Sequence, residues 1–465
     1  MIYDLAIIGA GSGGLSVAAA AAQFGQRVVL FEKGKMGGDC LNYGCIPSKA
    51  LIAAAKRAHA MRTAGIYGIK PTEPQVDFKK VHAYVQSVIA AIEPNDSVER
   101  FEKLGVKVVL AAARFRDAMS VEADGQVFTA RRFVIATGSR PAVPPIPGLE
   151  TVSYLTNETV FENKMLPKHL IIIGGGPAGI ELAQAHRRLG SDVTVIEALD
   201  LLGKEDPELA NIVLESLRGD GVKILARAAI KRVAKSKTGI AVELEGRGPI
   251  EGSHLLVAAG RVANVEGLNL EAAGVACSAK GVNVDKGLRS SRKHIYAIGD
   301  AAGGLQFTHV ANYHAGLVIR NALFRLPVRN RTDIIPHVTF TDPELAHAGL
   351  SEAEALKQFG SGIKVVRWPF HDNDRAQAEG KTAGLIKAVI GKRGKILGVG
   401  IVGVAAGELI QPWVLAMTEG LKIRSLASMV APYPTLGEIN RRVAVNYFSE
   451  FATNPWLRRV IGLLS

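Results

Sequence analysis

Two of the three cysteines in this chain, Cys40 and Cys45, lie close together in the segment "GGDCLNYGCIPSK" at residues 37–49. A close pair of thiols in a chain of 465 residues is typical of a redox-active or metal-binding site rather than of a structural disulfide framework. A zinc site would need two further Cys or His ligands, and no Cys-x-x-Cys or His pair of matching spacing accompanies these thiols. The pattern therefore favours a pair that is reversibly oxidised and reduced.

The residues around the two thiols suit that chemistry. In a regular α-helix, positions five apart have Cα atoms about 8–9 Å apart, and a disulfide bridges only about 7 Å or less. We therefore expect a distorted turn between the cysteines, where Asn42 and Gly44 supply backbone freedom. The segment "IPSKALIAAAKRAHAM" then predicts a helix, and a thiol at a helix start near a cation such as Lys49 has a lowered pKa.

An internal repeat provides the elements that hold this segment. "LAIIGAGSGG" at residues 5–14 returns as "LIIIGGGPAG" at 170–179, and "RVVLFE" at 27–32 returns as "DVTVIE" at 192–197. In each copy an apolar, β-branched run predicts a strand, Gly-x-Gly-x-x-Gly predicts a turn into a helix, and a second apolar run ends in glutamate. The spacing from the first glycine to that glutamate is 23 residues in both copies.

Each copy has the arrangement that binds a dinucleotide. The first glycine permits a tight turn, the second lets a pyrophosphate approach the backbone, and the third allows the helix to pack closely on the strand. These positions are Gly9, Gly11 and Gly14 in the first copy and Gly174, Gly176 and Gly179 in the second. The closing glutamates, Glu32 and Glu197, would bind an adenosine ribose, and Glu197 would repel a 2′-phosphate, so the second site is predicted to prefer NADH over NADPH. Two such sites indicate two cofactors that exchange electrons; ordinary strand-to-helix turns with incidental glycines are the alternative.

The composition narrows the class of protein. Hydrophobic residues make up 48% and charged residues 21% of the chain, as expected for a globular protein of roughly two to four domains. The excess of 56 Lys and Arg over 43 Asp and Glu gives a net charge of +13, which favours anionic ligands but is spread along the chain without a nucleic-acid-binding pattern. The first strand begins at once and contains Asp4, so no secretory signal is expected, and no apolar run predicts a membrane span. Sparse cysteine use is typical of a reducing cytoplasm.

Further motifs extend over nearly the whole chain. They are "ATGSRP" at 136–141, "GGGPAGIELAQ" at 174–184, "AAGRVAN" at 258–264, "YAIGD" at 296–300 and "VTFTDPELAHAGLSE" at 338–352. With "GGDCLNYGCIPSK" and the first glycine fingerprint, they give a sequence that resembles the pyridine-nucleotide disulfide oxidoreductases. These flavoproteins include dihydrolipoamide dehydrogenase, glutathione reductase and mercuric reductase.

The resemblance implies two cofactors and the residues that hold them. FAD would be bound by the first fingerprint and Glu32, with Asp300 accepting hydrogen bonds from the ribityl chain. NADH would be bound by the second fingerprint and Glu197. Further cofactor-binding glycines would be Gly38, Gly138 and Gly260.

The resemblance also implies a role for each residue near the thiols. Cys45 would face the flavin, and Cys40 would be the outer thiol that meets the substrate. Lys49 would lie near the reactive flavin nitrogen as well as binding the cofactor, paired with Glu181. A solvated surface position is the alternative for Glu181.

The implied architecture is an α/β fold with two Rossmann-like dinucleotide-binding domains, for FAD and NAD, and a C-terminal α+β dimerisation domain. The FAD-binding domain would be discontinuous, at residues 1–150 and 263–335, with the NAD-binding domain at 151–262 and the dimerisation domain at 336–465. In the last domain, "GLIKAVI" and "KILGVGIVGV" predict antiparallel strands and "ELIQPWVLAMTEGL" predicts an amphipathic helix. Such proteins are homodimers, because each site borrows residues from the partner's interface domain.

The C-terminal segment "APYPTLGE" departs from the disulfide-reducing relatives. They carry His-Pro-Thr-x-x-Glu there, and this chain matches the glutamate with Glu438 but has Tyr433 in place of the histidine. A phenol with a pKa of about 10 does not shuttle protons near neutrality as an imidazole of about 6.5 does. A tyrosine near this position is a feature of mercuric reductases, where a phenol oxygen can help hold a soft metal ion.

Two other features bear on the substrate. Asp39 stands where relatives usually have threonine, and a carboxylate beside Cys40 is expected to raise the pKa of that thiol and to favour a cationic substrate. The end of the chain, "WLRRVIGLLS", contains no cysteine, whereas mercuric reductases carry a C-terminal cysteine pair that relays the ion. The likeness to mercuric reductase is therefore incomplete.

The sequence as a whole predicts an FAD-dependent oxidoreductase that passes electrons from NADH through the Cys40–Cys45 pair to a metal ion such as Hg(II) or to a disulfide, similar to mercuric reductase. Dihydrolipoamide dehydrogenase, an NADH oxidase or transhydrogenase with incidental thiols, and a redox sensor without turnover are the alternatives. Expected partners are a small-molecule or metal-ion substrate and a second copy of the chain, without nucleic acid or membrane contact.

The remaining expectations concern three histidines, the third cysteine and the C-terminal tail. His309 is expected to have a packing or backbone role, whereas His337 and His371 could approach the substrate channel. Cys277 is expected to be structural and to lie in a loop. The tail "NPWLRRVIGLLS" is expected to pack on the dimer, with contact to an anionic membrane as the alternative.

Overall fold

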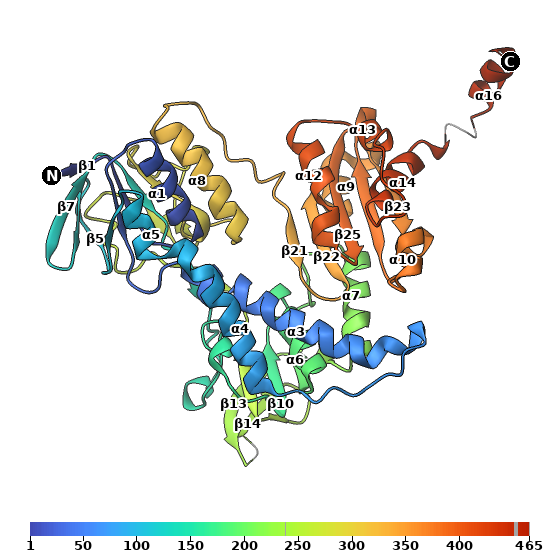
Figure 1. Cartoon of the computed structure of the whole chain (residues 1–465), viewed down its shortest axis with the longest axis horizontal. Coiled ribbons are helices and arrows are strands. Elements are labelled where there is room, and N and C mark those ends of the chain that lie inside the picture. The colour runs from blue at the N-terminus through green and yellow to red at the C-terminus, as the bar shows by residue number, and fades with distance from the viewer. Residues whose placement is uncertain (238, 451–453, 465) are drawn as a thin grey trace.

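Two parallel sheets and one antiparallel sheet organise the chain in the computed structural model, which describes residues 1–237, 239–450 and 454–464 (Figure 1). The N-terminal sheet is parallel, in the order β20 (Ile295–Ala297), β8 (Phe133–Ile135), β2 (Leu5–Ile8), β3 (Val28–Phe31), β4 (Lys107–Val109). The central sheet is parallel, in the order β12 (Lys223–Leu225), β11 (Asp192–Ile196), β10 (His169–Ile173), β16 (His254–Val257). The C-terminal sheet is antiparallel, in the order β21 (His337–Thr339), β22 (Glu344–Gly349), β25 (Ile396–Gly403), β24 (Leu385–Ile390), β23 (Lys364–Pro369).

Both faces of the N-terminal sheet are covered. Its strands are apolar at every position of β2 and β3, as expected for parallel strands that are buried on both sides. One face packs against α1 (Ser12–Gln23) and α8 (Thr308–Ala322), which lie side by side. The other face packs against a second, mixed sheet of β1 (Ile2–Tyr3), β7 (Gln126–Ala130), β6 (Ser120–Ala123) and β5 (Arg114–Asp117).

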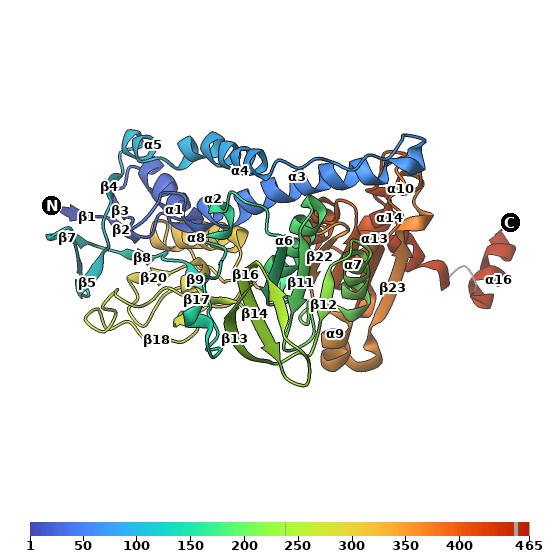
Figure 2. The ribbon, with the colours of Figure 1, turned by 90° about the horizontal axis from the view of Figure 1, so that it is seen from below.

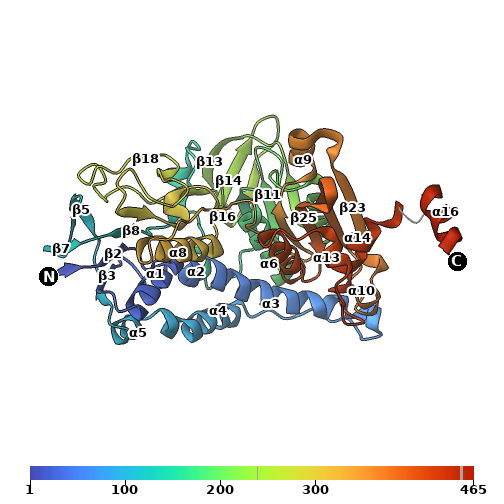
Figure 3. The same ribbon diagram turned by 90° about the horizontal axis from the view of Figure 1, so that it is seen from above.

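The central sheet repeats the same plan. Helices α6 (Pro177–Leu189) and α7 (Pro207–Gly219) contribute to the core on one face, and the other face packs against β13 (Ile230–Ser236), β14 (Gly239–Leu244) and β15 (Ile250–Gly252). Helix α6 also packs against α3 (Cys45–Thr63), which in turn contacts α4 (Phe78–Ile92). Figures 2 and 3 show α3 and α4 running along one side of the molecule, from the N-terminal sheet toward α10 (Asp374–Ala378). The helix after the cysteine segment therefore connects distant parts of the fold.

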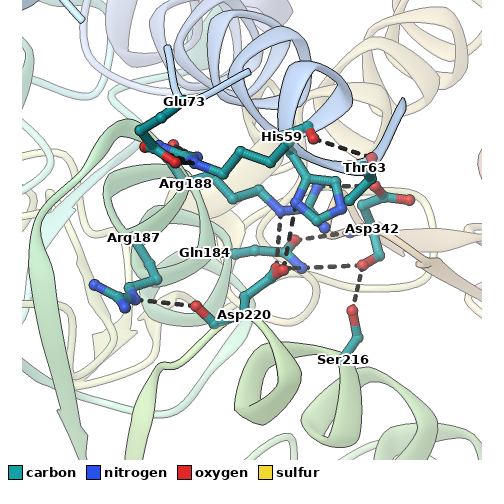
Figure 4. Close-up of polar contacts among 10 residues, drawn as sticks. His59, Thr63, Glu73, Gln184, Arg187, Arg188, Ser216, Asp220 and Asp342 are labelled. Carbon is teal, nitrogen blue, oxygen red and sulfur yellow. Dashed lines mark hydrogen bonds and ion pairs between the residues drawn. The ribbon is translucent and has the colours of Figure 1, made fainter. Parts of the chain in front are cut away.

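A buried polar junction ties these parts together (Figure 4). The guanidinium of Arg188, on α6, is 2.8 Å from Asp220 after α7 and 2.8 Å from Asp342, between β21 and β22. Gln184 donates to the Asp220 carboxylate and to the backbone carbonyl of Asp342, and His59 on α3 lies 3.5 Å from the Asp220 carboxylate. Arg188 is 5% exposed, so its two charge partners are needed to offset the loss of hydration.

The C-terminal sheet confirms the two predicted antiparallel strands, β24 and β25. The segment predicted as one helix, "ELIQPWVLAMTEGL", instead forms α11 (Ala406–Leu409) and α12 (Gln411–Thr418). The prediction was wrong because Pro412 lies in the first turn of α12, where a proline suits a helix start and does not continue a helix that precedes it. The remaining helices around this sheet are α9 (Glu352–Phe359), α13 (Ile423–Ala427) and α14 (Glu438–Asn446).

The last described helix, α16 (Pro455–Leu464), stands apart from the rest of this single chain (Figures 1 and 2). Its exposed apolar side chains include Trp456, Ile461, Leu463 and Leu464. Part of the tail preceding it, residues 451–453, and residue 465 lie outside the described residues. Among the residues that the structure describes, no helix combines the length and the apolar character needed to cross a membrane.

Candidate active site

The two thiols flank a break between helices. Cys40 lies in α2 (Gly38–Asn42), which ends before Tyr43, and Cys45 is the first residue of α3. Gly44 between them has φ −126° and ψ −108°, which is not helical. Both thiols are free, Cys40 half-buried and Cys45 exposed. The distorted turn that a bridge between them requires is therefore confirmed.

The cysteine segment lies directly against the first glycine fingerprint. Gly37 forms a parallel bridge with Gly11, and a Cβ added to Gly38 would come within 2.7 Å of the Gly11 Cα atom. Gly37 and Gly38 both have positive φ, of 84° and 59°, which favours glycine. Only this close approach brings the start of α2 next to the turn that follows β2.

In the first fingerprint the middle glycine has space for a Cβ atom, whereas the two outer glycines have none. A Cβ on Gly9 would lie 2.3 Å from the Ala136 carbonyl oxygen, and a Cβ on Gly14 would lie 1.9 Å from the Gly9 carbonyl oxygen. At Gly11 the nearest atom would be 4.0 Å away. The outer glycines thus permit the turn and the packing of α1, and the middle glycine leaves free the side from which a pyrophosphate would approach.

The second fingerprint shows the same pattern. A Cβ on Gly174 would lie 2.3 Å from the Ala258 carbonyl oxygen, and a Cβ on Gly179 would lie 2.1 Å from the Gly174 carbonyl oxygen. Gly176 has no atom within 4 Å of its added Cβ. Both turns therefore fit a dinucleotide, and neither has a side chain where its phosphates would lie.

The two closing glutamates are held in matching ways. Each accepts hydrogen bonds from two backbone N–H groups of its own turn, which fixes the carboxylate at the end of the second strand. The donors are Ala10 and Gly34 for Glu32, and Gly175 and Leu199 for Glu197, at N···O distances of 2.7–3.0 Å.

The electrostatic surroundings shift the pKa values of the two thiols in opposite directions. The pKa of Cys45 is lowered to about 6, first by a hydrogen bond from the Cys40 thiol and then by the contact with Thr308 and the charge of Lys49, which together outweigh the opposing effect of burial. The Cys45 Sγ atom is 3.3 Å from the Thr308 hydroxyl, and its place at the first turn of α3 also favours a thiolate. The same hydrogen bond and burial raise the pKa of Cys40, and the charge of Asp39 adds to that rise. Cys45 is therefore the thiolate of the pair and Cys40 the thiol.

Lys49, which is partly exposed, forms an ion pair beside the thiols with Glu181, which is buried. The Lys49 Nζ atom is 2.7 Å from Glu181 Oε2, and Glu181 Oε1 accepts a hydrogen bond of 2.9 Å from the backbone N–H of Phe340. Glu181 is 5% exposed, so a solvated surface position is excluded. Lys49 also lies 4.3 Å from the centre of the Phe340 ring, which adds a cation–π contact.

Asp39 is engaged by other residues of the chain. Its Oδ1 atom is 3.2 Å from the Arg261 guanidinium and accepts a hydrogen bond of 3.0 Å from Asn157. Arg261 also donates to the Ser139 hydroxyl, which donates to Asp300 at 2.5 Å. Burial raises the pKa of Asp300. The expected influence of Asp39 on Cys40 is therefore present, but Arg261 offsets part of its negative charge.

Tyr433 and Glu438 do not pair with each other in this chain. The Tyr433 hydroxyl, 69% exposed as a residue, donates to Asp374 at 2.8 Å, and this contact raises the pKa of the phenol. Glu438 instead forms an ion pair with Arg442, one turn later on α14, at 2.8 Å. The histidine–glutamate arrangement of the disulfide-reducing relatives thus has no counterpart at these two positions.

The structure also shows the positions of two predicted cofactor-binding glycines, of His309 and of Cys277. Gly138 and Gly260 have positive φ and stand just before the paired strands β9 (Ser139–Pro141) and β17 (Arg261–Ala263). His309 Nε2 donates a hydrogen bond of 2.7 Å to the Pro336 carbonyl oxygen, and the ring stacks on Phe307, in line with a packing or backbone role. Cys277 lies in the short strand β18 (Cys277–Ser278) and is exposed, so the predicted loop was wrong.

The two histidines that could approach a substrate channel have other partners than the thiols. His337 is 3.0 Å from Glu205 and stacks on Phe307, and His371 is exposed and 3.6 Å from its neighbour Asp372. Among the described residues, no group of three or more His, Cys, Asp or Glu side chains is placed to hold a metal ion.

Comparison with known proteins bears directly on this arrangement. Residues 3–315 match the family described as pyridine nucleotide-disulphide oxidoreductase, and residues 335–444 match its dimerisation domain. The chain belongs to the pyridine nucleotide-disulphide oxidoreductases. This oxidoreductase is thus an NAD(P)H-dependent flavoprotein of the class that acts on sulfur groups or on Hg(II).

Individual relatives of this oxidoreductase point to two activities. The mercuric reductase of Streptomyces lividans is 36% identical over 461 residues, which cover 97% of each chain. The dihydrolipoyl dehydrogenase of Geobacillus stearothermophilus is 36% identical over 450 residues, which cover 94% of each chain. A solved Cu(II) complex of the HOCl-induced flavoprotein disulfide reductase RclA from Escherichia coli superposes with a TM-score of 0.87 at 28% identity, covering 96% of this chain and 99% of that one.

Sequence reasoning about this oxidoreductase missed several contacts of the site. Phe340 lies in the motif at 338–352 and Thr308 precedes His309, but the local sequence does not indicate that these residues contact the Lys49–Glu181 pair and Cys45. Asn157 and Arg261 were missed as partners of Asp39, although a lone carboxylate before Cys40 signals the need for a nearby cation.

The asymmetry of the two thiols of this oxidoreductase gives a titration prediction. In a Cys277→Ser background, iodoacetamide should alkylate Cys45 with a rate that rises through a midpoint near pH 6, because only the thiolate reacts. Lys49→Met removes a positive charge and should raise that midpoint by about one unit, whereas Asp39→Asn removes a negative charge and should lower it. Equal midpoints in all three proteins would show that these charges do not set the reactivity of the pair.

Proposed function

We propose that this chain is an NADH-dependent flavoenzyme that reduces a soft metal ion, with Hg(II) as the leading candidate, through the Cys40–Cys45 pair. The observation that carries the proposal is the thiolate–thiol pair across a helix break, joined to a C-terminal segment with Tyr433 where disulfide-reducing relatives have histidine. Thiolates are the ligands that soft metal ions prefer. Relatives named mercuric reductase that are 35–36% identical support the same substrate.

The cofactor sites follow from the two fingerprints. Glu32 and the open turn at Gly11 would hold the adenosine diphosphate part of FAD, with Asp300 on its ribityl chain and the second fingerprint holding NADH. When bound, the flavin takes up a hydride from NADH and makes an electron pair available to the disulfide. The grouping of strands into sheets supports our division into an FAD-binding domain at 1–150 and 263–335, an NAD-binding domain at 151–262 and a dimerisation domain at 336–465.

Cys45 and Cys40 would have different roles during reduction of the metal ion. Cys45, at the helix start, would hold negative charge in the reduced pair, steadied by Thr308 and Lys49. Cys40 would keep a proton until a metal ion displaces it, because its pKa is raised. NADH would first reduce the disulfide to the thiolate–thiol pair and become NAD⁺. The pair would then release its remaining proton as it binds Hg(II), pass two electrons to the ion and re-form the disulfide, so that the net change is NADH and Hg(II) to NAD⁺, elemental mercury and one proton.

A homodimer in a reducing cytoplasm is part of the proposal. The match to the dimerisation domain supports a second copy of the chain as the partner. We expect each site to be completed by the C-terminal segment of the other subunit, as the sequence resemblance implies. There Tyr433 would offer a phenol oxygen to the metal ion rather than a proton relay to a disulfide.

Reduction of a disulfide such as lipoamide is the second candidate function. It is favoured by the dihydrolipoyl dehydrogenase of Geobacillus stearothermophilus, at the same 36% identity. Two observations argue against disulfide reduction: position 433 has a tyrosine in place of a histidine, and Glu438 pairs with Arg442. An NADH oxidase or transhydrogenase would turn over without the thiols, and a redox sensor would accept electrons from NADH without turnover.

The test is anaerobic consumption of NADH by the FAD-loaded enzyme, offered Hg(II) with excess small thiol in one assay and lipoamide in the other. Turnover with the metal that is lost in a Cys40→Ser variant is the expected result. Turnover with lipoamide alone would contradict the proposal, because it would mean that a group other than an imidazole at position 433 serves the interchange thiol.

The preference for NADH gives a separate prediction. Glu197→Gln should reduce the ratio of kcat/KM for NADH to that for NADPH by about tenfold, because the charge that repels a 2′-phosphate is removed while the side chain keeps its shape. The matched control is Glu32→Gln, which changes the equivalent residue of the other fingerprint and should weaken FAD retention without changing the ratio. A ratio that is unchanged in Glu197→Gln would remove the basis for assigning NADH.

A further inference from the structure

A basic cavity lies at the edge of the N-terminal sheet where β8 and β20 begin. Its volume is about 380 Å³, within the size range of small-molecule sites. Its lining contains four permanent cations and no carboxylate; the residues are Arg132, Arg289, Lys293, His294, Tyr296, Asn321 and Arg325. A cavity with this lining has a positive potential that favours an anion.

The fold gathers these cations from three distant parts of the chain. Arg132 precedes β8, Arg289 and Lys293 precede β20, and Arg325 follows α8. Figure 2 shows β8 and β20 close together. Four cations that lie far apart in the sequence are therefore brought together at this edge by the tertiary structure.

One cation of the cavity is held in a fixed orientation. The Arg289 Nε and Nη2 atoms donate to Asn321 Oδ1 at 2.9 and 2.8 Å, and the same oxygen accepts a hydrogen bond of 2.9 Å from the Tyr296 hydroxyl. Asn321 is 6% exposed and Tyr296 is 3% exposed. These buried contacts fix the plane of the guanidinium and leave its remaining N–H groups for another acceptor.

The other cations stand without a carboxylate. Within residues 1–237, 239–450 and 454–464, no hydrogen bond or ion pair is found for the side chains of Arg132, Lys293 and Arg325. The neighbouring Arg131, by contrast, is 3.2 Å from Asp4. Like charges that converge without a counter-charge repel one another, and an anion in the cavity would relieve that repulsion.

We propose that this cavity is a binding site for a compact polyanion with two or more phosphate groups, separate from both dinucleotide sites. The glycine fingerprints follow the carboxyl ends of β2 and β10, whereas the cavity lies where β8 and β20 start, at the opposite edge of the parallel sheet. The four positive charges match the negative charge of a diphosphate. The planar guanidinium groups of the arginines can each donate two parallel hydrogen bonds to phosphate oxygens.

The test is calorimetric titration of inorganic pyrophosphate into the FAD-loaded protein at low salt, with NAD⁺ present to fill the second fingerprint. The variant Arg132→Ala/Arg325→Ala should weaken the binding at least tenfold. The control Arg116→Ala/Arg393→Ala removes two exposed arginines elsewhere, and Arg393 shares the left-handed backbone of Arg325, with φ of 57° against 56°.

Binding by the wild type and the control, but not by the cavity variant, would establish the site. Two results would overturn the proposal: no saturable binding to the wild type under these conditions, or equal affinity in the cavity variant and the control. Bound flavin, measured by its absorbance, verifies that each variant is folded.

Discussion

Cys45→Ser is expected to lower kcat for NADH-dependent reduction of Hg(II) by about a thousandfold or more, because a serine hydroxyl can neither form the disulfide nor bind the metal ion as a thiolate. Serine is close to cysteine in size, and Thr308 can still contact a hydroxyl, so the start of α3 should be preserved. The measurement is anaerobic NADH consumption at saturating metal ion, with bound FAD quantified in the same sample.

Cys277→Ser is the matched control for that experiment. Cys277 is the third cysteine of the chain and is exposed in β18, outside the contacts of the thiol pair, so its replacement should leave kcat unchanged. A Cys45→Ser protein that keeps more than a tenth of the wild-type rate would mean that the thiols are incidental. NADH oxidation by oxygen or quinone would then be the function to pursue.

The second large effect is expected for stability. Arg188→Met should lower the free energy of unfolding by about 3–5 kcal/mol, because it leaves Asp220 and Asp342 buried without the cation that both contact. The junction in Figure 4 joins α6, the end of α7 and the segment before β22, so their packing should loosen together. The midpoint of thermal unfolding of the FAD-loaded protein measures the effect.

An exposed ion pair provides the comparison. Arg227 also contacts an aspartate through its guanidinium, Asp200 at 2.9 Å, but both side chains are more than half exposed. Arg227→Met should therefore change the unfolding midpoint little, since water and salt screen such pairs. Equal midpoints for the two variants would show that burial of the Arg188 junction does not contribute as we expect.

Much of the fold could be predicted because its signals are local. Each fingerprint contains an apolar run, three glycines at fixed spacing and a closing glutamate within a short segment, so β2, α1 and β3, or β10, α6 and β11, follow directly from the sequence. The start of α3 after the cysteines was predicted for the same reason, because Gly44 and the helical segment behind it are neighbours in the chain.

The contacts that tune the site could not be predicted, because they join residues far apart in the sequence. Thr308 reaches Cys45 only through the packing of α8 on the N-terminal sheet, and Arg261 reaches Asp39 only through the pairing of β17 with β9. Neither spacing nor residue type reveals such a contact in advance. The replacement of a histidine by Tyr433 was visible in the sequence, but its hydrogen bond to Asp374 was not.

The two phosphate-binding turns have a consequence for how one chain tells its cofactors apart. In both copies a side chain on either outer glycine would clash with a backbone carbonyl oxygen, at nearly the same distances, whereas the middle glycine has room for a Cβ atom. In both copies the glutamate accepts a hydrogen bond from a backbone N–H group of the turn. Two turns with the same geometry cannot by themselves distinguish a flavin dinucleotide from a nicotinamide dinucleotide. Selectivity must therefore come from the residues around each turn. Among the residues that the structure describes, the cysteine-bearing segment packs against the first turn, at the bridge between Gly11 and Gly37, so the neighbouring segments distinguish the two sites.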